Sequence, residues 1–383
     1  MKRLACLLLC LTLLAPALAL ADGTLDERVA RTFKNYRTTG GALVVAKDGE
    51  IVYEKYYGYA DRRAKTPVTE KTCFRTASVT KMITAIHVMQ LVEDGLLDLD
   101  EDIGAYLGYP VVNPHAKDTP TTLRNLMSHT SALDPHGGYS RTGSRLDELI
   151  DASHTKGWSN YYEYRSGRKY KYSNFGAGIM GSLIEAVTGK NVDDSVREGV
   201  FDPLEINAAY HAGLLADTAQ VANLYDDQGN LTMNQSASLR RKWDPGVDPN
   251  GHFRITIGSV WINARDLCRL GMLLCDGGTL DDQALLAEET VAEMMSDQKG
   301  KGNITCETPY GLCVNRVDNL LKGKMIYGHQ GLSEGILCNL YFDPETHFVF
   351  AMVTNGSSTN MDDHIGKLSR KLFAIAWENF GGK

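Results

Sequence analysis

Apolar residues recur at two different spacings along this chain, and the change between the spacings predicts the architecture. Near the amino terminus, Gly41 to Lys47 and Glu50 to Tyr57 are strand-like runs that meet at Asp48-Gly49, a dipeptide typical of a tight hairpin. Near the carboxyl terminus, Ile336 to Phe342 and Phe348 to Thr354 are joined by another short turn. Each end of the chain therefore predicts a hairpin.

Helical spacing flanks and separates these hairpins. Residues 25–37 and 361–380 each carry an apolar stripe with a helical period. Between about 76 and 250, apolar residues mostly follow helical periods, as in 78–94 and 177–188. We therefore predict an α/β protein of the α+β type, with an antiparallel sheet built from both chain ends, flanking terminal helices and an inserted, mainly helical region.

The first 21 residues differ from the rest. A basic start, an apolar run from Leu4 to Leu14 and small residues up to Ala21 are typical of a secretory signal cleaved before Asp22. The run is too short to span a bilayer. We therefore expect an exported protein, periplasmic or extracellular, without a stable membrane span.

The remaining residues, 22–383, are expected to form one catalytic unit. Residues 22–75 and 251–383 supply its α/β part, and 76–250 its inserted helical part. Its apolar content of 43% and charged content of 23% are those of a globular protein. Removing the signal lowers the formal charge from −7 to −9 and leaves no basic cluster, which excludes nucleic acid as a partner. We expect a monomer that binds a small substrate.

Six cysteines remain after cleavage, and their spacing fits neither a zinc site nor a dense disulfide framework. Cys268 and Cys275 are seven apart on a predicted helix, about 10 Å between Cα atoms, which is too far for a disulfide. Cys306 and Cys313 flank a short loop that they could close, and the sequence leaves that pairing open. No metal or cofactor site is expected.

Ser78-Val79-Thr80-Lys81 opens the first long helix. A serine there usually only caps the helix. However, the positions that follow are apolar or small nearly all the way round, so the helix is expected to be buried. Residues three apart share a helix face, and a desolvated lysine has a lowered pKa. Lys81 is therefore a plausible base for the weakly nucleophilic Ser78 hydroxyl.

Two further motifs have both a functional and a structural interpretation. Tyr172-Ser173-Asn174 follows several cations. In the functional interpretation Tyr172 relays a proton to the leaving group, a role that requires these cations to favour its phenolate, and Asn174 holds Lys81 or the substrate amide. The alternative is a polar loop entering a helix. Gly328-His329-Gln330-Gly331 precedes a strand whose edge would meet the substrate, with the N–H groups of Leu332 and Ser78 as the oxyanion hole. The alternative is an ordinary loop histidine.

The three motifs, in this order, resemble the serine β-lactamase and penicillin-binding protein superfamily. The Y-x-N form is similar to the branch that holds class C β-lactamases, D-alanyl-D-alanine carboxypeptidases, D-aminopeptidases and esterases. Phe74 to Lys81 is very like the family's segment around its nucleophile. Leu126 to Leu133 resembles its L-x-x-H-T-S-G-L segment, with Ala132 in place of glycine. The resemblance covers essentially the whole mature chain.

This resemblance implies that Ser78 is acylated, that Lys81 and Tyr172 share the proton transfers, and that Asn174 orients Lys81 or the substrate. His329 and Gly331 stand where β-lactamases have K-T-G, and Gln330 replaces the threonine that would grip a carboxylate. A peptide or ester substrate, such as a D-amino-acid or cell-wall peptide, is therefore favoured.

The alternatives are a true β-lactamase and a penicillin-binding sensor that acylates without turnover. We expect specificity to depend on residues 134–143 and 205–250. We also expect activity to change between about pH 5.5 and 7.5 as His329 titrates.

Overall fold

The computed structural model describes residues 23–134, 139–153, 159–216, 221–240, 243 and 246–382. The expected signal, residues 1–21, lies outside these residues, as does part of the 134–143 loop. Within the described part of the chain, no helix is both long and apolar enough to cross a bilayer.

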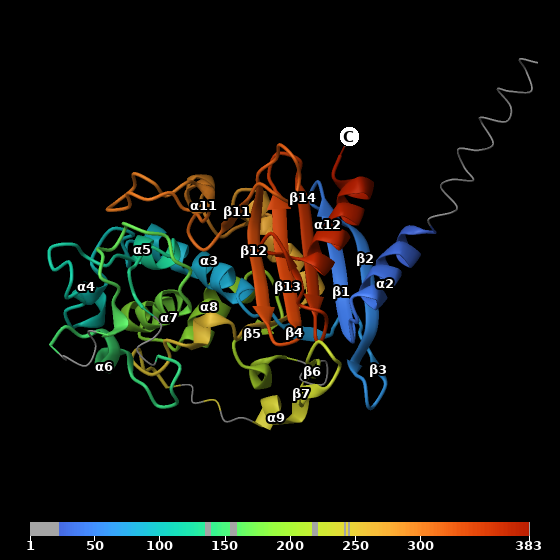
Figure 1. Ribbon diagram of the computed structural model, residues 1–383, viewed down its shortest axis with the longest axis horizontal. Helices are drawn as coiled ribbons and strands as arrows, with labels where there is room; N and C mark the ends of the chain where they lie inside the picture. Colours follow the sequence, from blue (N-terminus) through green and yellow to red (C-terminus); the bar gives the residue numbers. More distant parts are fainter. Residues whose placement is uncertain are drawn as a thin grey trace, which may run out of the picture.

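A seven-stranded antiparallel sheet forms the centre of the molecule (Figure 1). Its order is β11-β12-β13-β14-β1-β2-β3, so the β1–β14 pair joins strands from the two ends of the chain. Both predicted hairpins are present. The strands are β1 (Gly40–Lys47), β2 (Glu50–Asp61), β3 (Thr66–Pro67), β11 (Asn315–Val317), β12 (Ile326–Ser333), β13 (Ile336–Asp343) and β14 (Phe348–Thr354).

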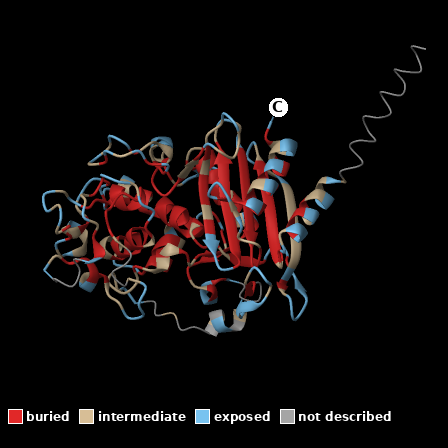
Figure 2. Cartoon of the chain, in the orientation of Figure 1, coloured by how far each residue is buried: buried red, intermediate tan, exposed pale blue. Residues whose placement is uncertain are grey.

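Helices cover both faces of the sheet. Because side chains alternate along a strand, Leu43 of β1 packs with α2 (Leu25–Asn35) and α12 (Lys367–Phe380), whereas Val44 faces the main core with α10 (Ala264–Cys275). The central strands are buried on both faces (Figure 2). The predicted sheet with flanking terminal helices is therefore confirmed.

The predicted helix over residues 361–380 is wrong at its beginning. A small hairpin of β15 (Met361–Asp362) and β16 (Ile365–Gly366) comes first, and α12 begins at Lys367. The two residues at its turn, Asp363 and His364, have left-handed φ values of 46° and 65°. A helical period in the side chains cannot reveal this turn, because contacts with β12, described below, hold it in place.

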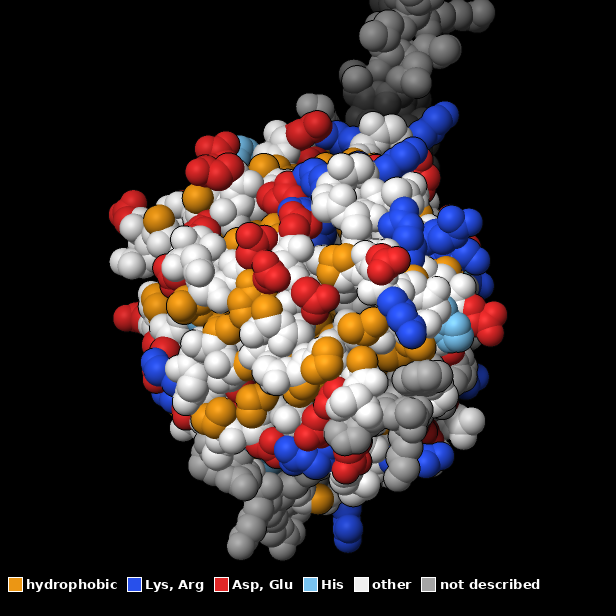
Figure 3. Space-filling view, turned by 90° about the vertical axis from the view of Figure 1, so that its left-hand side faces the viewer, with side chains coloured by type: hydrophobic (Ala, Val, Ile, Leu, Met, Phe, Trp, Pro, Cys, Tyr) orange, Lys and Arg blue, Asp and Glu red, His pale blue; other side chains and the backbone are white. Residues whose placement is uncertain are grey.

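The region between the two ends is mainly helical, as predicted, although its assignment as an inserted part stays a prediction. Figure 3 looks onto this end, where hydrophobic side chains form a band among charged ones of both signs. The remaining helices are α3 (Val79–Glu93), α4 (Ile103–Leu107), α5 (Leu123–Met127), α6 (Leu146–Ile150), α7 (Asn174–Thr188), α8 (Val192–Val196), η3 (Arg197–Phe201), η4 (Ala212–Leu214), α9 (Gln235–Arg240), η6 (Ile255–Ile257) and α11 (Glu288–Met295). The short strands are β4 (Cys73–Arg75), β5 (Ala208–Ala209), β6 (Leu224–Tyr225), β7 (Leu231–Met233), β8 (Trp261–Asn263), β9 (Thr279–Leu280) and β10 (Gln283–Ala284).

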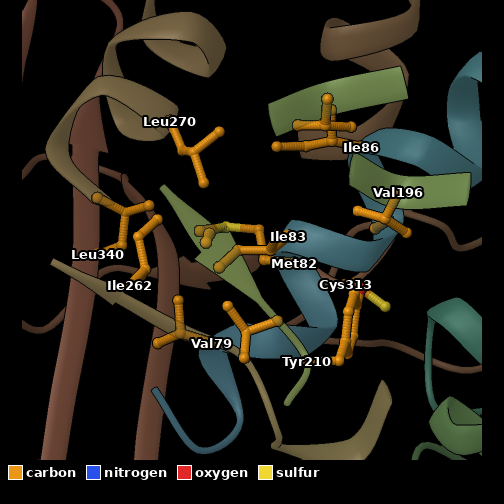
Figure 4. Close-up of a cluster of buried hydrophobic side chains, with 14 of the residues drawn as sticks. Val79, Met82, Ile83, Ile86, Val196, Tyr210, Ile262, Leu270, Cys313 and Leu340 are labelled. Carbon is orange, nitrogen blue, oxygen red and sulfur yellow. The ribbon is translucent and has the colours of Figure 1, made fainter. Parts of the chain in front are cut away.

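Helix α3 is buried nearly all the way round, as its sequence predicts. Figure 4 shows Met82 and Ile83 of α3 among side chains from the sheet and from other helices, including Leu340 of β13 and Leu270 of α10. A polar side chain that points from α3 into this core is desolvated. Lys81 is in that position, with none of its surface exposed.

Helix α7 brings its backbone unusually close to η6. A Cβ atom on Gly178 would lie 2.2 Å from the carbonyl oxygen of Phe253, and one on Gly181 would lie 3.0 Å from Thr256. Thr256 in turn donates a hydrogen bond to the carbonyl of Gly178 at 3.0 Å. The glycines of this helix therefore serve close packing, which fixes η6 relative to the core.

The cysteines of the described chain are all free thiols. A Cys306–Cys313 disulfide, which the sequence left open, is absent because Cys313 is buried against Met180, with 3.8 Å between their sulfur atoms, while Cys306 remains half-buried. Cys268 and Cys275 are buried in α10, as their spacing predicts.

Candidate active site

Ser78 lies at the end of a tight turn that leads into α3. Ala77, just before it, has a left-handed φ of 46°, which costs energy for a residue with a Cβ atom. Neighbouring hydrogen bonds hold the turn: the amide and hydroxyl of Thr76 both donate to the carbonyl of Val260, at 2.9 and 3.1 Å. The Ser78 side chain makes no capping hydrogen bond to α3, so its hydroxyl is available for another partner.

That partner is Lys81, one helical turn later. Its Nζ donates to Ser78 Oγ at 2.9 Å and to the carbonyl oxygen of Ile257 at 2.7 Å. Burial lowers the pKa of Lys81 to about 7, with the nearby Cys313 thiol acting weakly in the opposite direction. A substantial fraction of the amine is therefore neutral near pH 7, as expected from the buried helix.

The carbonyl of Ile257 is a contact that the sequence does not reveal. It belongs to η6, which packs on the glycines of α7, and a main-chain oxygen leaves no mark in the residue types. Its position fixes where the Lys81 amine lies relative to Ser78.

Tyr172 lines the same cavity as Ser78, and its ring centre lies 5.3 Å from Lys81 Nζ. Burial raises the pKa of the Tyr172 phenol, so the condition that nearby cations favour its phenolate is not met. The cations that precede Tyr172 in sequence point elsewhere: Lys169 lies over Tyr164 and Lys171 over Tyr162. Tyr172 therefore stays a phenol that can donate its proton.

Asn174 begins α7, directly after Ser173, whose hydroxyl caps the helix by accepting from Gly176 N at 3.0 Å. The Asn174 side-chain oxygen is buried without a hydrogen-bond partner among the described residues. The two hydrogen bonds of Lys81 go to Ser78 and Ile257. Of the two expected partners of Asn174, this geometry favours a substrate N–H group.

His329 lies on β12 and is almost fully buried. Its Nδ1 donates to the carbonyl of Gln330 at 2.8 Å, which leaves Nε2 as a lone pair without a partner among the described residues. Burial, together with the nearby Lys81, lowers the pKa of His329 to about 3. The expected charging of His329 at mildly acidic pH is therefore wrong, because the buried ring stays neutral there.

Gly331 brings β12 against the Ser78 turn. A Cβ atom at this position would lie 2.1 Å from the carbonyl oxygen of Thr76 and 3.2 Å from Ser78 N. Only glycine permits this approach of strand to turn. The next residue, Leu332, is 44% exposed, and its side chain lines the opening beside Ser78.

A cavity of about 810 Å³ opens at Ser78. The regions expected to set specificity, 134–143 and 205–250, contribute none of its described lining residues. Instead the C-terminal third supplies most of them. They are Ser78, Tyr170, Tyr172, Asn174, Pro309, Tyr310, Asn315, Arg316, Val317, Asp318, Asn319, Gln330, Leu332, Asp363, His364 and Ile365.

A second histidine, His129, supports the site from behind, although no role was assigned to it from the sequence. Its Nδ1 accepts from the backbone N–H of Ser173 at 3.2 Å, and its ring lies 4.2 Å from that of Tyr172 and 5.0 Å from that of Tyr310. Burial holds the pKa of His129 well below its usual value. A neutral His129 thus anchors the segment that carries Tyr172. The L-x-x-H-T-S-like segment was the available signal.

The described residues include one grouping of potential metal ligands away from the cavity lining. Cys275, Asp276 and His347 each place a ligand atom within 4.8 Å of the others. These atoms already have partners, since the Cys275 thiol donates to the carbonyl of Asp343 and His347 pairs with Asp276 at 2.7 Å. These contacts account for the grouping.

Activity at this site is expected to rise with pH, with a midpoint near pH 7. Lys81 accepts the Ser78 proton only when it is neutral, and its pKa is lowered to about 7. The measurement is kcat/KM from pH 5 to 9 with a substrate that does not titrate. Since His329 does not titrate in this range, the His329→Ala variant should keep the midpoint. Loss of the midpoint in that variant would reinstate His329 as the titrating group.

Comparison with known proteins identifies relatives along most of the chain. The family model described as Beta-lactamase matches residues 22–374. Penicillin-binding protein 4 of Amycolatopsis lactamdurans is 28% identical over 340 residues, which cover 86% of this chain and 84% of that protein. The D-aminopeptidase of Brucella anthropi is 30% identical over 367 residues, which cover 92% of this chain but only 62% of that protein.

Solved structures give the same fold. The octameric penicillin-binding protein homologue from Pyrococcus abyssi superposes with a TM-score of 0.71 at 21% identity, over 93% of this chain and 77% of that one. This likeness confirms the predicted fold class.

Proposed function

Since the chain belongs to the beta-lactamase family and is a serine hydrolase, we propose that it cleaves amide or ester bonds through an acyl-enzyme on Ser78. The observation that carries the proposal is the 2.9 Å hydrogen bond between Ser78 Oγ and a buried Lys81 amine whose pKa is about 7. A neutral amine in this position accepts the serine proton as Oγ attacks a carbonyl carbon.

The surrounding groups fit the remaining steps. Tyr172, as a phenol, donates its proton to the leaving nitrogen or oxygen and recovers one from the Lys81 ammonium. The N–H of Ser78 at the start of α3, with that of Leu332, is proposed to stabilise the developing oxyanion. Asn174 accepts a hydrogen bond from the substrate. Water then attacks the acyl carbon while Lys81 accepts its proton, and the bond from that carbon to Ser78 Oγ breaks as Oγ takes the proton back from the Lys81 ammonium.

We propose a peptide or ester as the substrate rather than a β-lactam. At the position of K-T-G, His329 stays neutral and Gln330 bonds to the protein itself, so neither grips a carboxylate. The D-aminopeptidase relative, at 30% identity, supports this choice.

The test is covalent labelling of the mature protein with a fluorophosphonate, followed by mass spectrometry of the modified peptide. Labelling is expected at Ser78, and the Ser78→Ala variant should not be labelled. Labelling that persists in this variant would refute the assignment.

Hydrolysis of p-nitrophenyl esters and D-amino-acid amides is expected to exceed that of nitrocefin. Rapid nitrocefin turnover would identify a β-lactamase, and labelling without turnover of any substrate would identify a binding protein.

We also propose that the protein is exported and that residues 1–21 are removed. The basic start and the apolar run that follows support this. Expression of the full sequence in a bacterial host, followed by amino-terminal sequencing of the secreted or periplasmic fraction, should give a chain that begins at Asp22. A cell-associated chain that begins at Met1 would contradict the proposal.

A further inference from the structure

The charged residues that line the cavity beside Ser78 are unequal in sign. Among the described lining residues the arginine is Arg316, which is neutralised by Asp297, with 3.1 Å between Nη1 and Oδ2. Two lining carboxylates, Asp318 and Asp363, have no ion pair with a described Lys or Arg side chain, whereas the neighbouring Asp362 pairs with Arg370 at 3.0 Å. Asp363 accepts only an amide hydrogen bond, from Asn319 Nδ2 at 2.6 Å. The wall formed by these residues therefore has an excess of negative charge.

The β15–β16 hairpin, which carries Asp363 and is hereafter the acidic hairpin, is hydrogen-bonded to β12, the strand that approaches Ser78. Gln330 donates from Nε2 to the carbonyl of His364 at 3.1 Å, and its Oε1 accepts from the amide of Gly366 at 2.8 Å. These two bonds hold His364 and Gly366, the residues that directly follow Asp363 in the hairpin. Gln330 thus uses its side chain to place a carboxylate at the cavity, where the related β-lactamase motif has a threonine.

Aromatic rings line another part of the same cavity. Tyr170, Tyr172 and Tyr310 all line it, and the rings of Tyr170 and Tyr310 stack at 5.7 Å. The faces of tyrosine rings attract ammonium groups, with an energy that grows as the cation is desolvated. Lys81 Nζ already lies over the Tyr172 ring and the other two rings stack on each other, so the rings supply a largely apolar surface. The carboxylates beside that surface favour a cation over a neutral or anionic group.

We infer that the cavity selects substrates that carry a positively charged group, such as an ammonium, and that Gln330 is the positioning residue that holds the acidic hairpin for this selection. The inference rests on the proposed serine hydrolase function and narrows its substrate class. Both carboxylates are solvent-exposed, so each contributes a modest attraction that salt screens.

The experiment compares three p-nitrophenyl esters that differ in charge and little in shape. They are the esters of 4-(trimethylammonio)butanoate, of its neutral isostere 5,5-dimethylhexanoate, and of hydrogen adipate. We expect kcat/KM to be about tenfold higher for the cationic ester than for the neutral one, and lowest for the anionic one. The preference should fall severalfold in 1 M NaCl.

Variants then test which residues cause the preference for the cationic ester. Asp318→Asn and Asp363→Asn should each lower the cationic-to-neutral ratio of kcat/KM by about threefold, mainly through KM. Gln330→Ala should lower the same ratio by releasing the hairpin. Asp282→Asn is the matched control, since Asp282 is also exposed and left-handed but lies outside the cavity lining, and it should keep the wild-type ratio.

Two failures are distinguishable. If Ser78 is labelled and the neutral or anionic ester is hydrolysed as fast as the cationic one, the charge selection is wrong while the hydrolase proposal stands. An unchanged ratio in both aspartate variants would likewise refute the assigned residues. If Ser78 is not labelled, the proposed function itself fails.

Discussion

Replacing Lys81 with methionine is expected to lower kcat/KM by about a thousandfold or more while the protein remains folded. Methionine fills nearly the same volume in the buried environment of α3, so the change removes the amine and little else. Without it, the Ser78 hydroxyl loses the one basic group that the described residues place in hydrogen-bond contact with it. General-base catalysis is typically worth about a hundredfold to ten-thousandfold in rate.

The measurement is steady-state hydrolysis of a p-nitrophenyl ester alongside the rate of fluorophosphonate labelling, and both should fall together. Lys171→Met is the matched control, because Lys171 is an exposed lysine whose ammonium lies over the Tyr162 ring. It should retain activity within a factor of about three. A Lys81→Met variant that keeps a tenth of the wild-type rate would exclude Lys81 as the base.

The same variant tests the burial of the amine. The pKa of Lys81 is about 7 in the folded chain, against 10.5 for the unperturbed group, so between these values the unfolded chain binds more protons and stability rises with pH. Methionine removes this dependence. The difference in Tm between variant and wild type should therefore be more favourable to the variant at pH 6 than at pH 9. An equal difference at both pH values would indicate a solvated amine.

Replacing Gly331 with alanine is expected to lower kcat/KM by about a hundredfold. The added methyl group would lie 2.1 Å from the Thr76 carbonyl oxygen, so either β12 or the turn before Ser78 must shift. A displacement of about 1 Å at a catalytic group is enough to lower a rate by this much. The Ala77 backbone is already in a left-handed conformation, so the turn before Ser78 has little freedom to shift.

Ser333→Ala, two residues further on β12, is the control for a substitution in this strand, because Ser333 is exposed. It should leave kcat/KM within a factor of about two. Thermal unfolding of Gly331→Ala is measured in parallel to separate loss of the fold from displacement of the site. Wild-type kinetics in Gly331→Ala would show that the strand does not need its close approach to Ser78.

Much of the fold follows from local pattern. Asp48 and Gly49 both have positive φ, as the tight hairpin predicted from this dipeptide requires. The continuous apolar surface of α3 likewise predicts its burial. The small β15–β16 hairpin could not be predicted in this way, because its turn is fixed by Gln330, thirty-four residues before His364 in sequence.

Some residues of the candidate site can likewise be predicted from local sequence pattern, and others cannot. Residue types and spacing identify Ser78 and Lys81, because one helical turn makes them neighbours whatever the rest of the fold does. The Ile257 carbonyl and the lining by residues 310–319 depend on distant segments meeting. His329 was found by motif but its charge was misjudged, since burial, not residue type, sets its pKa.

The pairing of β1 with β14 has a consequence for how the molecule is made. Leu43 lies opposite Met352, so the middle of the sheet closes only after β14 has left the ribosome. Until then the β1–β2 hairpin has an open edge and the helical region lacks the wall it packs against. Contacts this far apart in sequence slow folding. A chain that stops before Thr354 therefore loses a central strand of the sheet rather than one at its margin.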